Sequence, residues 1–454
     1  MNYQEIIDHQ RSFFNTNATK DIAFRIKELK RLKNVLQQNE SFIYSSIYQD
    51  FKKSEYETYV TELSIIYHEI DLALIKIKKW SKRKRASVGL ANLPGKSYII
   101  PEPFGTVLII GAWNYPYQLS IAPAVAAIAA GCTVILKPSE VPSNTSKAMA
   151  KIINQNFDPK FFKVIEGGVK ETSELLSIKF DKIFFTGSAT IGKIIYQAAA
   201  KYLTPVTLEL GGKSPAIITK DVNIDMTAKR LVWAKFLNAG QTCIAPDYVL
   251  VESSIKDKLL EAIKDQIKKA DYKVENQNYT QIINHKNFDR LVEMIDPDKI
   301  YLGGDHKKDD RIIPPTVLKD IEFSDKSMQD EIFGPILPVL SFDNIEEAIK
   351  KVKTLSKPLS CYVFTKNKSI KNKILNEVSF GGGAVNDAVM HFTEQSLPFG
   401  GIGDSGIGNY HGKYGFETFS HYKSILQKPF WVELNLKYAP YSAVKLKWLK
   451  RIIG

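Results

Sequence analysis

Apolar residues recur at helical spacing through the first eighty positions of the chain. One such set is Ile65, Ile66, Ile70 and Leu74. This spacing places apolar side chains on one face of an amphipathic helix. We therefore expect residues 1–80 to be helical, with the charged run Lys76 to Lys84 continuing the last helix.

Between residues 105 and 220, short apolar runs alternate with amphipathic stretches. The predicted strands are Thr106–Ile110, Thr133–Leu136, Phe162–Ile165, Lys182–Thr186, Thr207–Leu210 and Ala216–Ile218. The predicted helices lie near 118–130, 143–156, 170–177 and 190–200. Such alternation is typical of a parallel sheet covered by helices on both faces, with ligands at the carboxyl ends of the strands.

The alternation repeats from about 221 to 390 and predicts a second α/β lobe. Its expected helices lie near 225–238, 254–270, 286–296, 345–353 and 368–376. Its expected strands are Tyr248–Val251, Ile336–Ser341 and Ser360–Phe364. Residues 395–415 are rich in glycine and are expected to form a loop.

Length and composition agree with two or three lobes of a soluble globular protein, since 44% of the 454 residues are hydrophobic and 24% charged. Three cysteines make no disulfide framework and fit a reducing compartment, so we expect a cytoplasmic protein. No secretory signal is expected at the N-terminus, and no Cys/His cluster has metal-ligand spacing. The longest uncharged run, Leu119 to Leu136, divides at Gly131 into a buried helix and a strand, so we do not expect it to span a membrane.

The formal net charge of +13 is concentrated in two places. Lys76 to Arg85 holds seven basic residues, and the tail from Lys437 holds five and no acid. Neither run interleaves aromatic side chains as a base-stacking surface would, so no nucleic-acid partner is expected.

A glycine-containing turn follows the strand ending at Thr186. Glycine and a helix N-terminus suit a phosphate there, and Gly187 with Gly192-Lys193 nearly matches a Walker A loop. Ile194 stands where that loop needs a hydroxyl, which disfavours a nucleotide triphosphatase. The run from Gly401 to Gly406 matches a dinucleotide fingerprint but follows no strand, so we interpret it as a loop.

Cys243 is the candidate nucleophile and Glu209 the candidate base, because each is flanked by small residues that admit a ligand. Cys132 and Cys361 fall in apolar strands and are read as buried small side chains. Asn114, at a strand end, could donate its amide to an oxyanion, although asparagine before a proline turn is common.

Two further pairs suit a nucleotide. Lys137 and Glu140 follow a strand and could hold ribose hydroxyls, or could form an ordinary surface ion pair. Glu331 and Phe333 could hold a ribose and wall a flat heterocycle, or Phe333 could be a core residue before a turn.

Together these motifs resemble the aldehyde dehydrogenase superfamily, in the family's order along nearly the whole chain. The matching runs are Trp113–Pro116, Lys137–Glu140, Phe185–Ser188, Leu208–Lys213, Gly240–Cys243, Glu331–Pro335 and Pro398–Gly401. Residues 238–248 and 411–415 are most similar to the class 3 branch.

The resemblance implies that Cys243 attacks an aldehyde, that Asn114 and the Cys243 backbone N–H hold the oxyanion, and that Glu209 activates the water that hydrolyses the thioester. A lowered pKa of the thiol would come from a cationic cofactor ring or local amides. The cofactor implied is NAD, with NADP possible. Its implied contacts are Trp113, Lys137, Glu140, Gly187, Ser188, Gly192, Leu210, Gly211, Glu331 and Phe333.

The expected fold is therefore α/β, with two Rossmann-like open parallel-sheet lobes and a small bridging element. Residues 1–81 and 102–209 would bind NAD(P), and residues 210–390 would form the catalytic domain. Residues 82–101 and 420–435 would bridge or oligomerise, and the class 3 resemblance implies a homodimer. Residues 436–454 form a basic amphipathic tail.

Six apolar residues of that tail lie on one helical arc. They are Val444, Leu446, Trp448, Leu449, Ile452 and Ile453, and Lys447, Lys450 and Arg451 lie opposite them. Such a helix could lie on an anionic membrane surface, cover the substrate mouth or pack on a partner subunit. Some class 3 relatives oxidise long-chain aldehydes, so the expected substrate is an apolar aldehyde, long-chain or aromatic.

Overall fold

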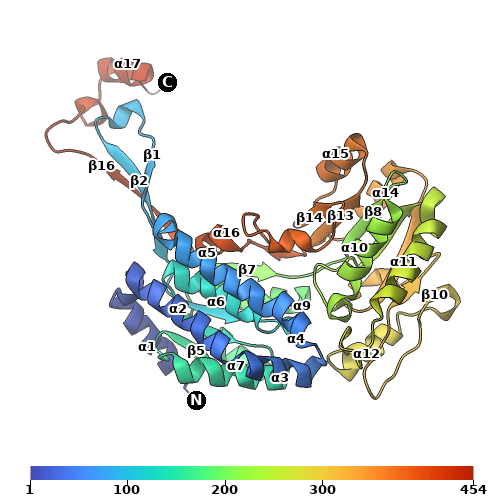
Figure 1. The fold of residues 1–454 in the computed structure, drawn as a ribbon. Helices are drawn as coiled ribbons and strands as arrows, with labels where there is room; N and C mark the ends of the chain where they lie inside the picture. Colours follow the sequence, from blue (N-terminus) through green and yellow to red (C-terminus); the bar gives the residue numbers. More distant parts are fainter. Residues whose placement is uncertain (1, 453–454) are drawn as a thin grey trace.

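The computed structural model describes residues 2–452 and contains three sheets, with a two-lobed body and an arm that projects from it (Figure 1). A six-stranded sheet has the order β15-β7-β6-β3-β4-β5, and a seven-stranded sheet has the order β10-β11-β12-β9-β8-β13-β14. A three-stranded sheet, β1-β2-β16, forms the arm. The α/β class with open parallel sheets is thus confirmed.

The N-terminal region is helical, as predicted. Its elements are α1 (Tyr3–Asn15), α2 (Ile22–Gln38), α3 (Glu40–Phe51), α4 (Glu55–Thr58), the π-helical turn η2 (Tyr59–Leu63) and α5 (Ser64–Trp80). The prediction that α5 runs on to Lys84 is wrong. Lys84 starts a strand and pairs with Ile99, a tertiary contact that the exposed basic run does not signal.

Five of the six strands of the first sheet are parallel: β3 (Thr106–Ile110), β4 (Thr133–Lys137), β5 (Phe162–Val164), β6 (Lys182–Thr186) and β7 (Val206–Glu209). Between them lie α6 (Gln118–Ala130), α7 (Ser143–Asn156), α8 (Val169–Leu176) and α9 (Ala189–Ala200). Alternate residues of β3 enter two different core clusters, so both faces of the sheet are covered. Gly131, with φ 102°, ends the fully buried α6, which confirms the predicted division of the long apolar run.

The seven-stranded sheet contains the three predicted strands as β9 (Tyr248–Glu252), β12 (Ile336–Phe342) and β13 (Ser360–Phe364), beside β8 (Pro215–Ile218). Short strands complete it: β10 (Ile300–Leu302), β11 (Thr316–Leu318) and β14 (Gly382–Val385). Its helices are α10 (Ile224–Phe236), α11 (Lys256–Ala270), α12 (His285–Val292), α13 (Lys326–Gln329), α14 (Ile345–Val352) and α15 (Lys368–Glu377).

Residues 395–415 are not all loop. The short strand β15 (Gly406–Ile407) pairs with β7, and α16 (Gly412–Thr418) starts within the range. Two residues of strand carry too little periodicity to be recognised in a sequence, and here the partner strand decides their conformation.

The arm consists of β1 (Lys84–Ala86), β2 (Lys96–Pro103) and β16 (Ser420–Gln427), and α17 (Ala443–Ile452) lies at its far end (Figure 1). Strands were predicted near 82–101 and 420–435, but β16 ends at Gln427. The tail helix was predicted over 444–453, and Ile453 lies outside the described residues. Across residues 2–452, we find no helix with the length and apolar character needed to cross a bilayer.

Opposite edges of the two main sheets face each other. The chain leaves the carboxyl end of β7 at Glu209 and enters the amino end of β8 at Pro215. The loops before β9 and β12 also lie at amino ends of the second sheet. The first sheet therefore follows the carboxyl-end rule for ligands, whereas the second contributes the loops that precede its strands.

Candidate active site

The loop that carries Cys243 begins with a strained turn after α10. Asn238 and Ala239 have φ of 54° and 51°, a conformation that non-glycine residues rarely adopt. A Cβ on Gly240 would lie 2.2 Å from the Gly334 carbonyl oxygen, so only glycine allows this close approach. Strain of this kind persists where the surroundings hold it, and it is concentrated at functional sites.

Asn114 lies beside this loop, at the carboxyl end of β3. Its Nδ2 donates a hydrogen bond to the Gln241 carbonyl at 3.0 Å, and the residue is 3% exposed. The hydroxyls of Tyr115 and Thr242 are 2.6 Å apart. An amide nitrogen has two hydrogens, so the one not given to Gln241 can be donated to a ligand beside Cys243.

Glu209 is buried at the end of β7, and neither of its carboxylate oxygens has a hydrogen-bond partner among the described residues. Burial raises the pKa of Glu209 well above its usual range. An unpartnered buried carboxyl costs stability and is the kind of group that a reaction or a ligand uses.

The carboxyls of Glu331 and Glu209 act electrostatically on the Cys243 thiol. Burial raises the pKa of the thiol, the charges of Glu331 and Glu209 raise it further, and the backbone amides of Cys243 and Ile244 partly oppose them. The pKa is therefore raised, whereas a lowered one was expected, because the amides contribute less than burial. Loss of the thiol proton requires a base or a cation at the site.

Glu331 and Phe333 lie on the loop before β12. A Cβ on Gly211 would lie 2.3 Å from a Glu331 carboxylate oxygen, so glycine makes room for this carboxyl. Burial first, and then the charge of Asp247, raise the pKa of Glu331 to about 8. The rings of Phe333 and Trp113 meet edge to face at 5.2 Å, and Phe333 has φ 50°.

Charged side chains of neighbouring elements bond the backbone of the loop before β12. Lys213 donates to the carbonyls of Ser327 and Asp330 at 2.9 and 2.8 Å. The loop N–H of Ile332 donates to Asp247, and Arg290 donates to the carbonyls of Glu331 and Ile332. The strained conformation of Phe333 is thus fixed by bonds to neighbouring elements.

At the carboxyl end of β4, Lys137 is buried and donates to the Pro138 carbonyl at 2.8 Å. Its Nζ lies 3.4 Å from the carboxylate of Glu140, whose side chain is 50% exposed. The pair offers one ammonium group and one accessible carboxylate, which suit ribose hydroxyls.

The β6–α9 turn lies at the same sheet edge. Ser188 is the N-cap of α9 and accepts from the Ile191 N–H at 3.4 Å. A Cβ on Gly192 would lie 2.8 Å from Leu210, so glycine lets α9 pack close to the end of β7. Gly187 follows β6 directly, and its N–H bonds the Glu209 carbonyl. A helix N-terminus beside parallel strand ends fits a pyrophosphate.

The structure therefore brings the predicted residues to facing edges of the two sheets. Asn114, Lys137, Gly187 and Glu209 come from the first sheet, and Cys243 and Glu331 come from loops of the second. These groups fit a dinucleotide with its reactive ring beside the Trp113–Phe333 pair, near Cys243. Within the described part of the chain, no three His, Cys, Asp or Glu side chains are grouped so that they could bind a metal ion.

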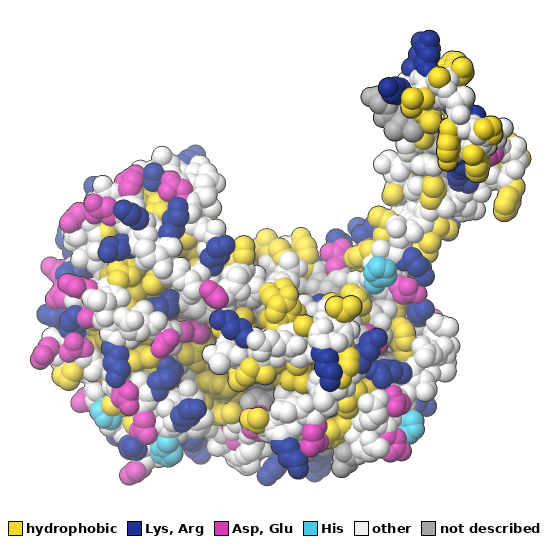
Figure 2. Space-filling model, turned by 180° about the vertical axis from the view of Figure 1, so that it is seen from behind, with side chains coloured by type: hydrophobic (Ala, Val, Ile, Leu, Met, Phe, Trp, Pro, Cys, Tyr) yellow, Lys and Arg dark blue, Asp and Glu magenta, His cyan; other side chains and the backbone are white. Residues whose placement is uncertain are grey.

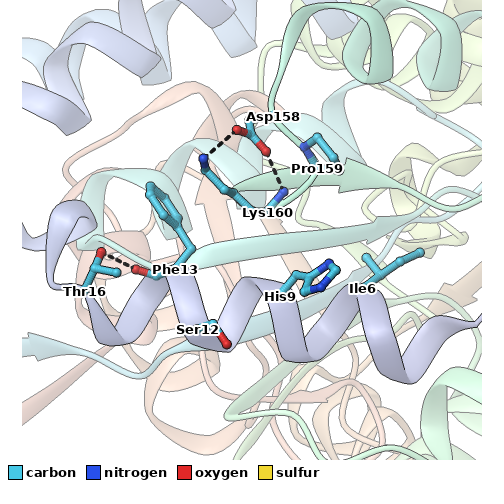
Figure 3. A pocket seen from close by; sticks show the side chains of 8 residues that line it. All are labelled: Ile6, His9, Ser12, Phe13, Thr16, Asp158, Pro159 and Lys160. Atoms are coloured by element: carbon cyan, nitrogen blue, oxygen red, sulfur yellow. Dashed lines mark hydrogen bonds and ion pairs between the residues drawn. The ribbon is translucent and has the colours of Figure 1, made fainter.

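A surface pocket of about 520 Å³ lies elsewhere, between α1 and the chain before β5 (Figure 3). Phe13 and Lys160 line it, and Asp158 pairs with Lys160. It opens at the amino edge of the first sheet, opposite the edge that carries Lys137, so it is separate from the candidate active site.

Sequence reasoning missed several groups around the site. Tyr115 and Thr242 stand next to predicted residues and could have been found as neighbours. Tyr410 and His411 pack with Phe399. Burial raises the pKa of Tyr410 well above its usual range, and the charges of Glu209 and Cys243 raise it further. Buried Lys53 and Glu62 contact the Asn114 loop, and no motif marks them.

The sequence profile described as "Aldehyde dehydrogenase family" matches residues 1–425. The chain is 44% identical over 444 residues to the 4,4'-diaponeurosporen-aldehyde dehydrogenase of Staphylococcus aureus, covering 97% of this chain and 96% of the relative. It is also 44% identical over 450 residues to aldehyde dehydrogenase family 3 member A2 of Rattus norvegicus, covering 98% and 93%. A solved structure of Staphylococcus aureus AldH, in a substrate-bound state, superposes with a TM-score of 0.97 at 43% identity and covers all of both chains.

Proposed function

The chain belongs to the aldehyde dehydrogenase family, whose members oxidise aldehydes with NAD or NADP, and on this premise we propose that Cys243 is its nucleophile, Glu209 its hydrolytic base and Asn114 its oxyanion donor. The observation that carries the proposal is the environment of Glu209. This carboxyl is buried without a partner, and its charge acts on the Cys243 thiol. An enzyme that must activate one water beside an acylated sulfur needs such a carboxylate.

The sulfur of Cys243 bonds to the aldehyde carbon and forms a thiohemiacetal. The oxygen that becomes negative is stabilised by the free hydrogen of Asn114 Nδ2 and by the Cys243 N–H. Bound NAD or NADP supplies the acceptor for the hydride that leaves this carbon. Glu209 then removes a proton from water, and the hydroxyl adds to the thioester carbon. The C–S bond breaks to give the acid and the Cys243 thiolate, which takes up the proton held by Glu209.

The cofactor would lie along the facing edges of the two sheets. Lys137 and Glu140 would hold the adenosine ribose, and Gly187 and Ser188 would receive the pyrophosphate at the N-terminus of α9. Glu331 and Phe333, with Trp113 beside Phe333, would hold the nicotinamide ribose and ring. The flanking contacts are Gly192, Leu210 and Gly211. An exposed carboxylate at Glu140 suits a ribose 2′-hydroxyl better than a 2′-phosphate, which favours NAD, with NADP also accepted.

The experiment is NADH absorbance with short, aromatic and long-chain aldehydes, comparing the wild type with Cys243→Ala. We expect aldehyde-dependent NADH from the wild type and none from the variant, with the acid as the product. Cys361→Ala is the matched control, because that cysteine is buried in a strand and should leave the rate unchanged. A wild type that binds NAD but oxidises no aldehyde would instead be a binding protein.

An apolar aldehyde is the proposed substrate class. Ala112, Tyr115 and Leu119 form a small buried apolar cluster beside Asn114, and Phe399 with Tyr410 forms an aromatic group near Glu209. The Staphylococcus aureus relative is named for 4,4'-diaponeurosporen-aldehyde. We expect kcat/KM to rise from short to long-chain or aromatic aldehydes, and equal values across the panel would contradict this assignment.

A homodimer bridged by the arm is proposed as the assembly. The arm sheet has β16 at its open edge, and β14 is the open edge of the seven-stranded sheet. Unpaired strand edges favour pairing with another chain. Light scattering should give about twice the chain mass of 51.3 kDa, and removal of residues 420–454 should give the monomer.

The tail is proposed to bind a membrane surface from the cytoplasmic side. No residue of α17 is buried, and apolar side chains gather along the arm and its tip (Figure 2), among them Trp448 and Phe430, which are 51% and 108% exposed. We expect the full chain to sediment with anionic liposomes and a chain lacking 440–454 to remain in solution. The matched control keeps the tail but replaces Lys447, Lys450 and Arg451 by glutamate, which removes the charge attraction to anionic lipid. Unchanged sedimentation of the shortened chain would rule out this role.

A further inference from the structure

A buried group of charges lies directly behind the proposed oxyanion donor. The Nζ of Lys53 is 3.3 Å from the carboxylate of Glu62, and both side chains are 0% exposed. Removing two charges from water is costly, and apolar residues of similar size often stabilise a core as well as such a pair does. A buried pair at this place therefore calls for a reason other than stability.

Both partners contact the loop that contains Asn114. Glu62 accepts from the N–H groups of Tyr117 and Gln118 at 2.7 and 3.3 Å, at the N-terminal end of α6. The Nζ of Lys53 lies 3.5 Å from the Asn114 carbonyl oxygen and 4.6 Å from the centre of the Tyr115 ring. The position of this loop thus depends on the pair at several points.

A third charge, Glu57, reaches the other loop of the site. Its carboxylate accepts from the Asn238 N–H at 2.8 Å, at the first residue of the left-handed turn before Cys243. The Asn238 side chain in turn donates to the Asn114 carbonyl at 2.9 Å. The carboxylates of Glu57 and Glu62 therefore contact both loops that flank the sulfur.

The π-helical turn η2 explains how one segment does this. Ser64 N–H bonds the Tyr59 carbonyl, a five-residue hydrogen bond. In an α-helix, residues five apart point about 140° away from each other. The wider π turn reduces that angle, so Glu57 and Glu62 both face the site. Single π turns are frequent at functional sites.

We propose that Lys53, Glu57 and Glu62 are positioning residues that clamp the Asn114 loop against the Cys243 loop and so set the Asn114 amide at the oxyanion. The inference rests on the proposed role of Asn114. All three contact backbone groups of the two loops, so in this role each acts through the loops that position Asn114. A displacement of about 1 Å at a reacting group can cost about a hundredfold in rate.

The test is a double-mutant cycle of Glu62→Gln with Asn114→Ala, measured as NADH formation in a single turnover. We expect Glu62→Gln to slow this step about 10- to 100-fold in the wild-type background and to have almost no effect when Asn114 is already alanine. The Kd of NAD should stay unchanged in all four proteins. Lys53→Met should behave as Glu62→Gln does.

Arg25→Met is the matched control for loss of a buried charge. Arg25 is 5% exposed and bonds the carbonyls of Thr19 and Ala129, away from the site. We expect it to lower the thermal midpoint as Lys53→Met does and to leave the single-turnover rate unchanged. Equal rate losses from Glu62→Gln in both backgrounds would overturn the clamp. A fast Asn114→Ala enzyme would instead overturn the proposed oxyanion role.

Discussion

The two main sheets approach the site in opposite ways. The six-stranded sheet presents the carboxyl ends of β3, β4, β6 and β7, where Lys137 and the N-terminus of α9 offer positive charge to a nucleotide. The seven-stranded sheet presents the loops before β8, β9 and β12, which carry Cys243 and Glu331. The two sheets therefore do not form two equivalent ligand-binding edges. The strand ends of the first sheet face the loops that precede the strands of the second.

The means of support differ as well. On the first sheet, strand ends and a helix N-terminus provide the groups directly, so local structure is enough. On the second sheet the loops are strained at Asn238, Ala239 and Phe333. Lys213, Asp247 and Arg290 bond the Phe333 loop, and Glu57 bonds the Asn238 turn. The groups proposed at the second sheet, Cys243 and Glu331, thus depend on long-range contacts for their position. Those at the first sheet, such as Lys137 and Glu209, depend mainly on the strand ends that carry them.

The sharpest test of the contact between the two edges is Glu209→Gln, which keeps the side-chain shape and removes the base. We expect steady-state turnover to fall about 10²- to 10⁴-fold, because water is no longer activated. The thioester on Cys243 should accumulate and be visible as an acyl adduct in the mass of the intact protein. A slow variant without an adduct would mean that Glu209 acts before the thioester forms. It would contradict the contact between Glu209 and an acylated Cys243.

Asn114→Ala should have the next largest effect. Removing one oxyanion donor costs about 10²- to 10³-fold in kcat, with little change in KM for the aldehyde. Steady-state kinetics over a range of aldehyde concentrations would show this division. Asn144→Ala, in α7, is the matched control and should leave kcat unchanged. A change confined to KM would make Asn114 a ground-state contact.

Lys137→Met should weaken cofactor binding at the first sheet without slowing the chemical step. We expect KM for NAD to rise about tenfold while the single-turnover rate at saturating NAD changes little, because the lost bonds go to the ribose and not to the reacting atoms. Glu140→Gln should lower the ratio of kcat/KM for NAD to kcat/KM for NADP. A loss of kcat equal to the loss of kcat/KM would mean that the two edges are not separate in function.

The last prediction concerns stability rather than turnover and is a pH dependence that comes from Glu331. Its pKa is raised from 4.5 to about 8 in the folded chain, so the folded state holds a proton that the unfolded state releases. This contribution is fully present below pH 4.5 and is lost as pH rises towards 8, with a slope of about 1.4 kcal/mol per pH unit. Urea unfolding at several pH values should therefore show wild type weakening relative to Glu331→Gln over that range. Parallel curves would contradict it.

Local signals were strong enough to predict most of the elements before the structure. Helix α6 ends at Gly131 because glycine takes the left-handed conformation, and β4 follows because its residues are apolar and β-branched. The proposed site residues Cys243, Glu209 and Asn114 were named from motifs in the family's order, and the structure brings them to facing sheet edges. The short strands β11, β14 and β15 were missed because pairing alone makes them strands.

What the sequence by itself determined is the set of elements with clear periodicity, the α/β class and the residue types of the reaction. Only the tertiary structure decided that a carboxyl edge meets an amino edge, that Asn238 is held in a strained turn, and that Lys53 and Glu62 lie behind Asn114. The reason is physical. Periodicity and capping act within a few residues, whereas these three features depend on groups from distant parts of the chain whose burial and charge favour one arrangement only when they meet.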